Sequence, residues 1–158
     1  MTPADWSAVA RIYEAGIAGG NATFEPDVPA SFEEWIRGKV QDPCLAAREE
    51  ASGEVLGWAA LGPYSARAVY RGVAEVSIYV DPAQARRGVG HALLTALIER
   101  SEVAGFWMLI AGIFPENEAS IALHEACGFK PVGTYERIGQ MPGGTWRDVQ
   151  MFQRRAKF

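Results

Sequence analysis

The sequence contains little cysteine and no long apolar run. Its only cysteines, Cys44 and Cys127, lie far apart and form no Cys-x-x-Cys pair, which indicates a reduced, cytoplasmic protein rather than a disulfide scaffold. A closed metal site would need both cysteines together with His91 and His124, and these spacings match no common ligand pattern. We therefore expect no metal. No segment is apolar enough to span a bilayer, and the N-terminus lacks the pattern of a signal peptide.

An excess of positive charge is also missing. The formal net charge is −4, from 15 Lys and Arg against 19 Asp and Glu. General binding to nucleic acid or to a membrane surface is therefore not expected. Hydrophobic residues make up 49% and charged residues 22% of the chain, as in ordinary soluble globular proteins. A length of 158 residues predicts a single domain over 1–158 that is long enough to bury a core.

The first segment predicts a helix that begins near Thr2, with no strand before it. Thr2 can cap the helix, Pro3 suits its first turn, and Gly19-Gly20 end the apolar stripe. Ser31 and Glu34 have the spacing of a capping box and predict a second helix.

Strand-like and helical segments then alternate along the chain. Ser52-Gly53 supplies turn chemistry between the first two strand-like runs and predicts a hairpin. The order indicates a mixed α/β domain with an antiparallel first half and at least one strand–helix–strand unit. The expected strands are a run around Leu45, 54–61, 74–80, a run from Trp107 and a last one in 148–155, and the later helices are 88–102 and 117–127.

A glycine-rich stretch, "ARRGVGHALL", opens the helix that follows the strand ending at Val80. A helix N-terminus offers free N–H groups and partial positive charge, and Gly88 and Gly90 allow a ligand to approach the backbone. With Arg86 and Arg87 this pattern favours a phosphate site, although it is neither a Walker loop nor a GxGxxG motif. The alternative is a tight turn with two solvated arginines.

The strand 73–80 alternates, so that Glu75, Ser77 and Tyr79 share one face. A carboxylate in the middle of a strand suits a general base for an amine, and partial burial would raise the pKa of Glu75 toward a working range. The alternative is a solvated or ion-paired glutamate, because one face of an antiparallel sheet can be exposed to water.

The segments "AEVSIYVDPAQARRGVGHALL" and "PENEASIALHEACGF", in this order of elements, resemble the GNAT superfamily of acyl-CoA N-acyltransferases. The resemblance implies a mostly antiparallel mixed sheet with helices on both faces, and a splayed parallel strand pair that holds acetyl-CoA. It places the coenzyme A pyrophosphate on a Q/R-x-x-G-x-G/A loop that maps to 85–90, where Ala85 departs from the pattern. It implies cofactor contacts at Ile78, Tyr79, Val80, Arg86, Arg87, Gly88, Val89, Gly90, His91, Asn117 and Ser120.

Other segments look like the phosphinothricin acetyltransferase branch: "NATFEPDVPASFEEW", "GWAALGPYSARAVYRGVAEVSIYV", "LHEACGF" and "GTWRDVQMF". This implies acetyl transfer to the α-amino group of a small amino-acid analogue such as phosphinothricin or methionine sulfoximine, and a homodimer. Members of that branch usually have a short strand before the first helix. Here either that strand is absent or the start lies upstream.

The resemblance also assigns catalytic roles. It places the catalytic glutamate at Glu75, and it puts His124 where many GNAT enzymes have a tyrosine that protonates the departing thiolate. An imidazole with a pKa of about 6.5 can serve in this role, but a histidine that only packs in the helix is an equal alternative. Asn117 and Ser120 fit both a helix N-cap and the implied contact to the cofactor.

The implied acceptor site contains arginines. In the branch, an R-x-x-Y-R segment, here Arg67 to Arg71, helps hold the acceptor, and Phe24 and Glu25 match a loop beside it. Guanidinium groups suit a carboxylate or phosphinate, although solvated loop arginines are the alternative.

Two other functions stay open. The first is a GNAT enzyme with another amine acceptor, such as a protein N-terminus or a polyamine. The second is a non-catalytic acyl-CoA-binding module. The arginines near Glu75 argue against a polycationic acceptor, and the presence of Glu75 and His124 beside an intact loop argues against a non-catalytic module.

Overall fold

The computed structural model describes all residues, 1–158, and its centre is a six-stranded sheet with the order β1-β2-β3-β4-β6-β5. Every neighbouring pair is antiparallel except β3 and β4, which run parallel. The predicted mixed α/β fold is confirmed. In chain order the elements are η1 (Pro3–Asp5), α1 (Trp6–Ala18), α2 (Phe32–Arg37), β1 (Cys44–Arg48), β2 (Val55–Pro63), η2 (Ala68–Tyr70), β3 (Val73–Val80), η3 (Pro82–Gln84), α3 (Val89–Val103), β4 (Met108–Ile113), α4 (Glu118–Ala126), β5 (Lys130–Gln140) and β6 (Trp146–Arg155).

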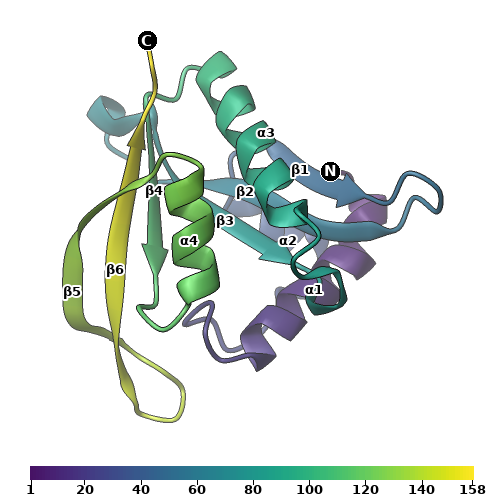
Figure 1. Ribbon diagram of the computed structural model, residues 1–158, viewed down its shortest axis with the longest axis horizontal. Helices are drawn as coiled ribbons and strands as arrows, with labels where there is room; N and C mark the ends of the chain where they lie inside the picture. The colour runs from purple at the N-terminus through teal and green to yellow at the C-terminus, as the bar shows by residue number, and fades with distance from the viewer.

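Helices cover both faces of the sheet (Figure 1). Helix α3 packs on one face through Leu94 and Leu97, and α1 packs on the other through Val9 and Ile12. Strand β2 is buried on both sides, so its apolar residues form a nearly continuous run instead of an alternating one. No helix has both the length and the apolar character needed to cross a membrane.

The predicted helical start is confirmed. A short 3-10 turn from Pro3 leads directly into α1, and the Asp5 carboxylate accepts a hydrogen bond from the backbone N–H of Thr2 at 2.8 Å. At α2, Ser31 accepts from the N–H of Glu34 at 3.2 Å, as the capping box predicts. The Glu34 carboxylate accepts the second hydrogen bond of the box from the N–H of Ala30, at 2.9 Å, and not from the N–H of Ser31 itself.

The parallel pair separates after a short paired region. Only Val73, Ala74 and Glu75 of β3 align with β4, at Met108, Leu109 and Ile110. Strand β3 continues to Val80 and pairs with β2 from Ala74 to Val80, without a register shift. The backbone of β3 beyond Glu75 therefore has no strand partner on the β4 side, which confirms the predicted splay.

Candidate active site

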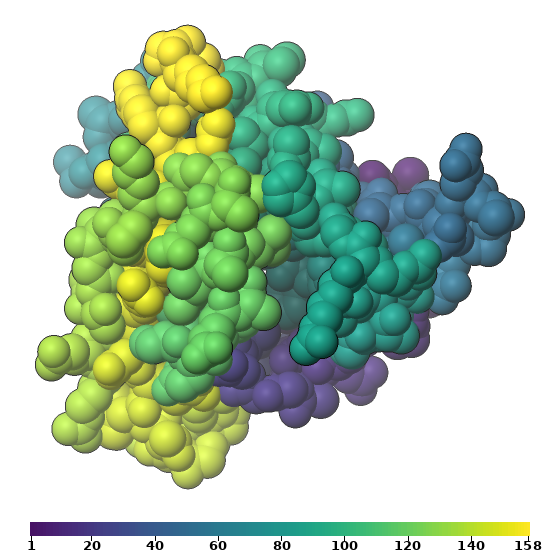
Figure 2. Space-filling view, in the orientation of Figure 1, coloured from purple at the N-terminus to yellow at the C-terminus, as the bar shows by residue number.

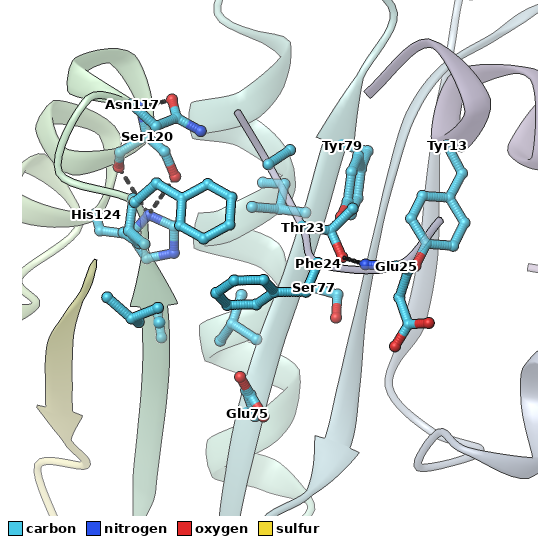
Figure 3. A pocket seen from close by; sticks show the side chains of 18 of the residues that line it. Tyr13, Thr23, Phe24, Glu25, Glu75, Ser77, Tyr79, Asn117, Ser120 and His124 are labelled. Carbon is cyan, nitrogen blue, oxygen red and sulfur yellow. Dashed lines mark hydrogen bonds between the residues drawn. The ribbon is translucent and has the colours of Figure 1, made fainter. Parts of the chain in front are cut away.

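A cavity of about 340 Å³ opens where β3 and β4 separate. Of the residues expected at the site, eight line it: Phe24, Glu25, Glu75, Ile78, Tyr79, Asn117, Ser120 and His124. Figure 3 shows Glu75, Ser77 and Tyr79 in succession along β3, with the loop that carries Phe24 and Glu25 beside them and His124 across from them on α4. The fold therefore brings together residues from three separate segments of the chain.

The glycine-rich stretch forms an exposed turn at the start of α3. Arg86 and Gly88 both have left-handed backbones, with φ of 63° and 81°, and Gly88 is the N-cap of the helix. Nothing lies within 4 Å of the position where a Cβ of Gly88 would be, so this backbone is open to a ligand. The surface is hollowed between α4 and this turn (Figure 2). Free N–H groups facing open space fit a phosphate.

The side chain of Arg87 beside this opening is held by two other residues. Its guanidinium donates to Gln84 and lies 3.4 Å from a carboxylate oxygen of Glu49. The turn itself is anchored by Asp81, whose carboxylate accepts from the N–H of Ala83 at 2.9 Å and from Arg11 at 2.6 Å. These hydrogen bonds from Arg11 and Ala83 lower the pKa of Asp81, so the anchor stays charged at neutral pH.

Glu75 is the last residue of β3 that pairs with β4. Its Oε1 lies 3.9 Å from the position of a Cβ at Gly112 on β4, so the carboxylate projects over the point where the strands separate. The residue is exposed, whereas partial burial was expected. The open side of the splay leaves this carboxylate accessible to an acceptor.

His124 is almost completely buried, with 2% of its surface exposed. Its Nδ1 lies 2.8 Å from the carbonyl oxygen of Ser120, and its Nε2 has no hydrogen-bond partner. Burial lowers the pKa of His124, and the contact with Ser120 opposes that shift only in part. The ring is therefore neutral at neutral pH, which argues against a resident general acid.

The loop with Phe24 and Glu25 is tied to α4 and β6. The Phe24 ring packs edge-on against Phe114, with centroids 4.9 Å apart. Asn117 uses both ends of its amide: Oδ1 accepts from the N–H of Ser120 at 3.1 Å, and Nδ2 donates to the carbonyl of Asn21 at 2.9 Å. Asn117 thus caps α4 and also holds the loop, a role that its N-cap position alone did not predict.

Arg147 on β6 strengthens the same connection. It lies in the segment "GTWRDVQMF", but that resemblance gave it no role. Its guanidinium donates to the carbonyl of Gly20 at 3.1 Å, to Oδ1 of Asn21 at 2.8 Å and to Glu116 at 2.9 Å. It also lies 4.1 Å from the ring centroid of Phe114. Arg147 positions the loop from outside the cavity.

The structure does not bring Arg67 and Arg71 into the cavity, although both were expected to read the acceptor. Arg67 lies 5.5 Å over the ring of Tyr70, and Arg71 lies 5.4 Å over the ring of Trp107. Both are exposed on the segment around η2. Neither guanidinium group lines the cavity beside Glu75; each lies against an aromatic ring instead.

The cation that does line the cavity is Lys39, which sequence patterns missed. It follows α2 by two residues, and its Nζ donates to the hydroxyl of Ser77 at 3.2 Å. Burial lowers the pKa of Lys39, while the charges of Glu75 and Glu25 oppose this shift. A single lysine after a short helix carries no motif, and only the fold places it here.

Aromatic rings form one wall of the cavity. Tyr79 stacks on Trp58 with centroids 4.7 Å apart, and Tyr13 lies 4.8 Å from Tyr79. Burial raises the pKa of both phenols, so they remain neutral. This wall excludes water and gives the cavity an apolar side.

Comparisons with known proteins agree with this geometry. The profile of the Acetyltransferase (GNAT) family matches residues 8–129. A phosphinothricin N-acetyltransferase of Streptomyces viridochromogenes is 38% identical over 97% of this chain and 84% of its own length. An L-methionine sulfoximine/L-methionine sulfone acetyltransferase of Pseudomonas paraeruginosa is 34% identical over 95% of this chain and 88% of its own length.

Solved structures are similar over almost the whole chain. A ribosomal-protein-alanine N-acetyltransferase from Brucella melitensis has a TM-score of 0.90 at 33% identity, covering 99% of this chain and 97% of its own. A GNAT superfamily phosphinothricin acetyltransferase from Sinorhizobium meliloti, solved in complex with AcCoA, has a TM-score of 0.86 at 33% identity, covering 98% and 85%. The chain belongs to the acetyltransferase (GNAT) family.

Proposed function

We propose that the protein is an N-acetyltransferase that moves the acetyl group of acetyl-CoA to the α-amino group of a small amino-acid analogue of the phosphinothricin or methionine sulfoximine type. The observation that carries the proposal is the position of Glu75 at the end of the paired region of β3 and β4, beside a cavity of about 340 Å³. A cavity of this size suits a small acceptor. The named relatives from Streptomyces and Pseudomonas support the acceptor class.

The residues around the splay fit acetyl-CoA. The N–H groups at the start of α3 would hold its pyrophosphate between Arg86 and Gly90, because that backbone is left-handed and open. The unpaired edge of β3 beyond Glu75 would bind the extended part of the molecule. Bound there, acetyl-CoA supplies a thioester carbonyl that an amine can attack. The homologous structure from Sinorhizobium with AcCoA supports this assignment.

Glu75 accepts the proton that the acceptor ammonium must lose before its nitrogen can attack. The nitrogen then bonds to the carbonyl carbon, the carbon–sulfur bond breaks, and coenzyme A leaves as a thiolate. The second proton of the nitrogen passes to this thiolate or to solvent, which gives the neutral amide and free coenzyme A. Free N–H groups on the open side of β3 face the oxygen that becomes negative during the attack. A cysteine thiol has a pKa of about 8.5, far below that of an alcohol, and a thiolate therefore leaves without strong acid assistance.

A second acceptor is a protein N-terminus. The Brucella structure with the TM-score of 0.90, a ribosomal-protein-alanine N-acetyltransferase, favours this acceptor. A protein acceptor must deliver an extended peptide to Glu75, whereas an amino-acid analogue needs only the enclosed volume.

The test is thiol release from acetyl-CoA with matched acceptors. We expect turnover with phosphinothricin and methionine sulfone, and little with a peptide that begins with alanine. Activity confined to the peptide would assign the second acceptor. No release above the background hydrolysis with any amine would leave a non-catalytic acyl-CoA-binding module.

Two further features belong to this proposal. We propose a homodimer and a cytoplasmic location, the compartment in which free thiols such as Cys44 and Cys127 stay reduced. Light scattering at two protein concentrations tests the dimer.

A further inference from the structure

Lys39 is a cation in the cavity without an ionic partner. Its side chain is only partly exposed, and its Nζ has one hydrogen bond, to the Ser77 hydroxyl at 3.2 Å. No carboxylate forms an ion pair with it, since the five ion pairs of the structure all involve arginine. An ammonium group has three donors. Lys39 therefore keeps donors available for a ligand.

Placing this cation in the cavity is costly in the absence of a ligand. A charged group that is taken out of water needs an opposite charge or several hydrogen bonds, and Lys39 has neither in full. Burial lowers its pKa, while the more distant charges of Glu75 and Glu25 act in the opposite direction. A bound anion would supply the missing partner at the Nζ atom.

The charges along β3 match the ends of an amino acid. Glu75 and Ser77 are two residues apart on one face of the strand, a separation of roughly 6.5 Å. The amine and the carboxylate of an α-amino acid are attached to the same carbon. An acceptor with its amine at Glu75 therefore has its carboxylate within reach of Ser77 and Lys39.

We propose that Lys39, with the hydroxyl of Ser77, binds the α-carboxylate of the acceptor and so selects amino acids over simple amines. This inference rests on the proposed function and assigns to Lys39 the part expected of Arg67 and Arg71. Those arginines stack on Tyr70 and Trp107 instead of lining the cavity. Lys39 is a specificity-determining residue, and Glu75 still takes the proton.

The experiment compares two acceptors that differ only in the acid group: methionine sulfone and its decarboxylated form, 3-(methylsulfonyl)propylamine. The variants are Lys39→Met, which keeps the length without the charge, Lys39→Arg, and the matched control Lys130→Met on exposed β5. For Lys39→Met we expect kcat/KM for the sulfone to fall roughly ten- to a hundredfold, mainly through KM, the loss typical of one charge-assisted contact. In the same variant, kcat/KM for the decarboxylated amine and KM for acetyl-CoA should each change by less than about twofold, because neither molecule uses that contact.

The outcomes separate this inference from the function on which it rests. A wild-type enzyme that acetylates neither acceptor overturns the proposed function and the inference with it. A wild-type enzyme that prefers the sulfone, with the preference unchanged in Lys39→Met, overturns only the inference. Loss of the preference in Arg71→Ala, with the preference unchanged in Lys39→Met, would assign binding of the acceptor carboxylate to Arg71 and overturn the inference. Partial recovery in Lys39→Arg, with normal thermal unfolding of all variants, supports binding by charge.

Discussion

The Nδ1 atom of His124 lies 2.8 Å from the carbonyl oxygen of Ser120, one turn earlier on α4. A carbonyl oxygen can only accept, so Nδ1 carries the proton and donates. The neutral ring then has a lone pair on Nε2, which is buried and has no partner in the protein. His124 thus lines the cavity as a neutral ring whose one free group is a hydrogen-bond acceptor, not an acid.

We expect His124→Phe to lower kcat by no more than about tenfold, the cost of losing one hydrogen-bond acceptor at the cavity wall, because Glu75 carries the proton transfer. Burial lowers the pKa of His124 below its ordinary 6.5. The wild-type rate should therefore hold above pH 6.5 and fall as acid protonates Nε2, and this acidic limb should vanish in the variant. The pH dependence of kcat between pH 5 and 8 checks this. An identical profile in both proteins would leave His124 a packing residue.

Glu75→Gln keeps the shape of the side chain but removes its basicity. Since Glu75 is exposed and lies at the end of the paired strands, the change should not disturb the core. We expect kcat to fall roughly 10²- to 10⁴-fold, the usual contribution of a general base, with acetyl-CoA binding unchanged. Calorimetric titration with acetyl-CoA and steady-state rates measure the two effects separately. Near-normal kcat would remove Glu75 from the mechanism.

Gly88 tests the phosphate loop, because its φ of 81° is unfavourable for any side chain. Gly88→Ala should cost about 1–2 kcal/mol of backbone strain and raise KM for acetyl-CoA several-fold, since the new methyl group enters the open space at the helix start. Gly53→Ala is the matched control: its φ is 72° and its surroundings are also open, but it lies in the β1–β2 hairpin. Equal rises of KM in both variants would show that strain alone is responsible.

Much of the fold could be predicted from sequence, because hydrophobic periodicity and capping residues mark its elements. Strand β5 could not. Ten of its eleven residues are exposed, so it has no alternation of apolar and polar side chains, and it contains Pro131 and Gly133. Its ladder with β6 is also irregular between Tyr135 and Gly139, where Arg137 has a φ of 50°. An exposed edge strand with bulges offers no pattern to read.

The candidate site also contains some residues that the sequence predicts and others that it does not. Glu75 and the turn from Arg86 to Gly90 lie in local patterns that predict their chemistry. Lys39 and Arg147 act through contacts made across the fold. Lys39 lies 38 positions from Ser77 in the sequence, and Arg147 lies 126 positions from Asn21, so no local sequence pattern can indicate either contact. Arginines close to Glu75 in sequence were the natural candidates for the acid group, but neighbours along a loop need not point the same way.

The hairpin of β5 and β6 contacts the acceptor loop at Gly139 as well as through Arg147. A Cβ at Gly139 would lie 2.5 Å from the ring of Phe24, whereas a Cβ at Gly133 on the same strand would meet nothing within 4 Å. Gly139→Ala should push Phe24 into the cavity and raise KM for the acceptor several-fold, with KM for acetyl-CoA unchanged, because the phosphate turn lies elsewhere. Gly133→Ala supplies the control, and steady-state kinetics with both substrates measure the split. A parallel rise in both KM values for Gly139→Ala, or equal effects of the two variants, would show that the hairpin does not shape the acceptor site.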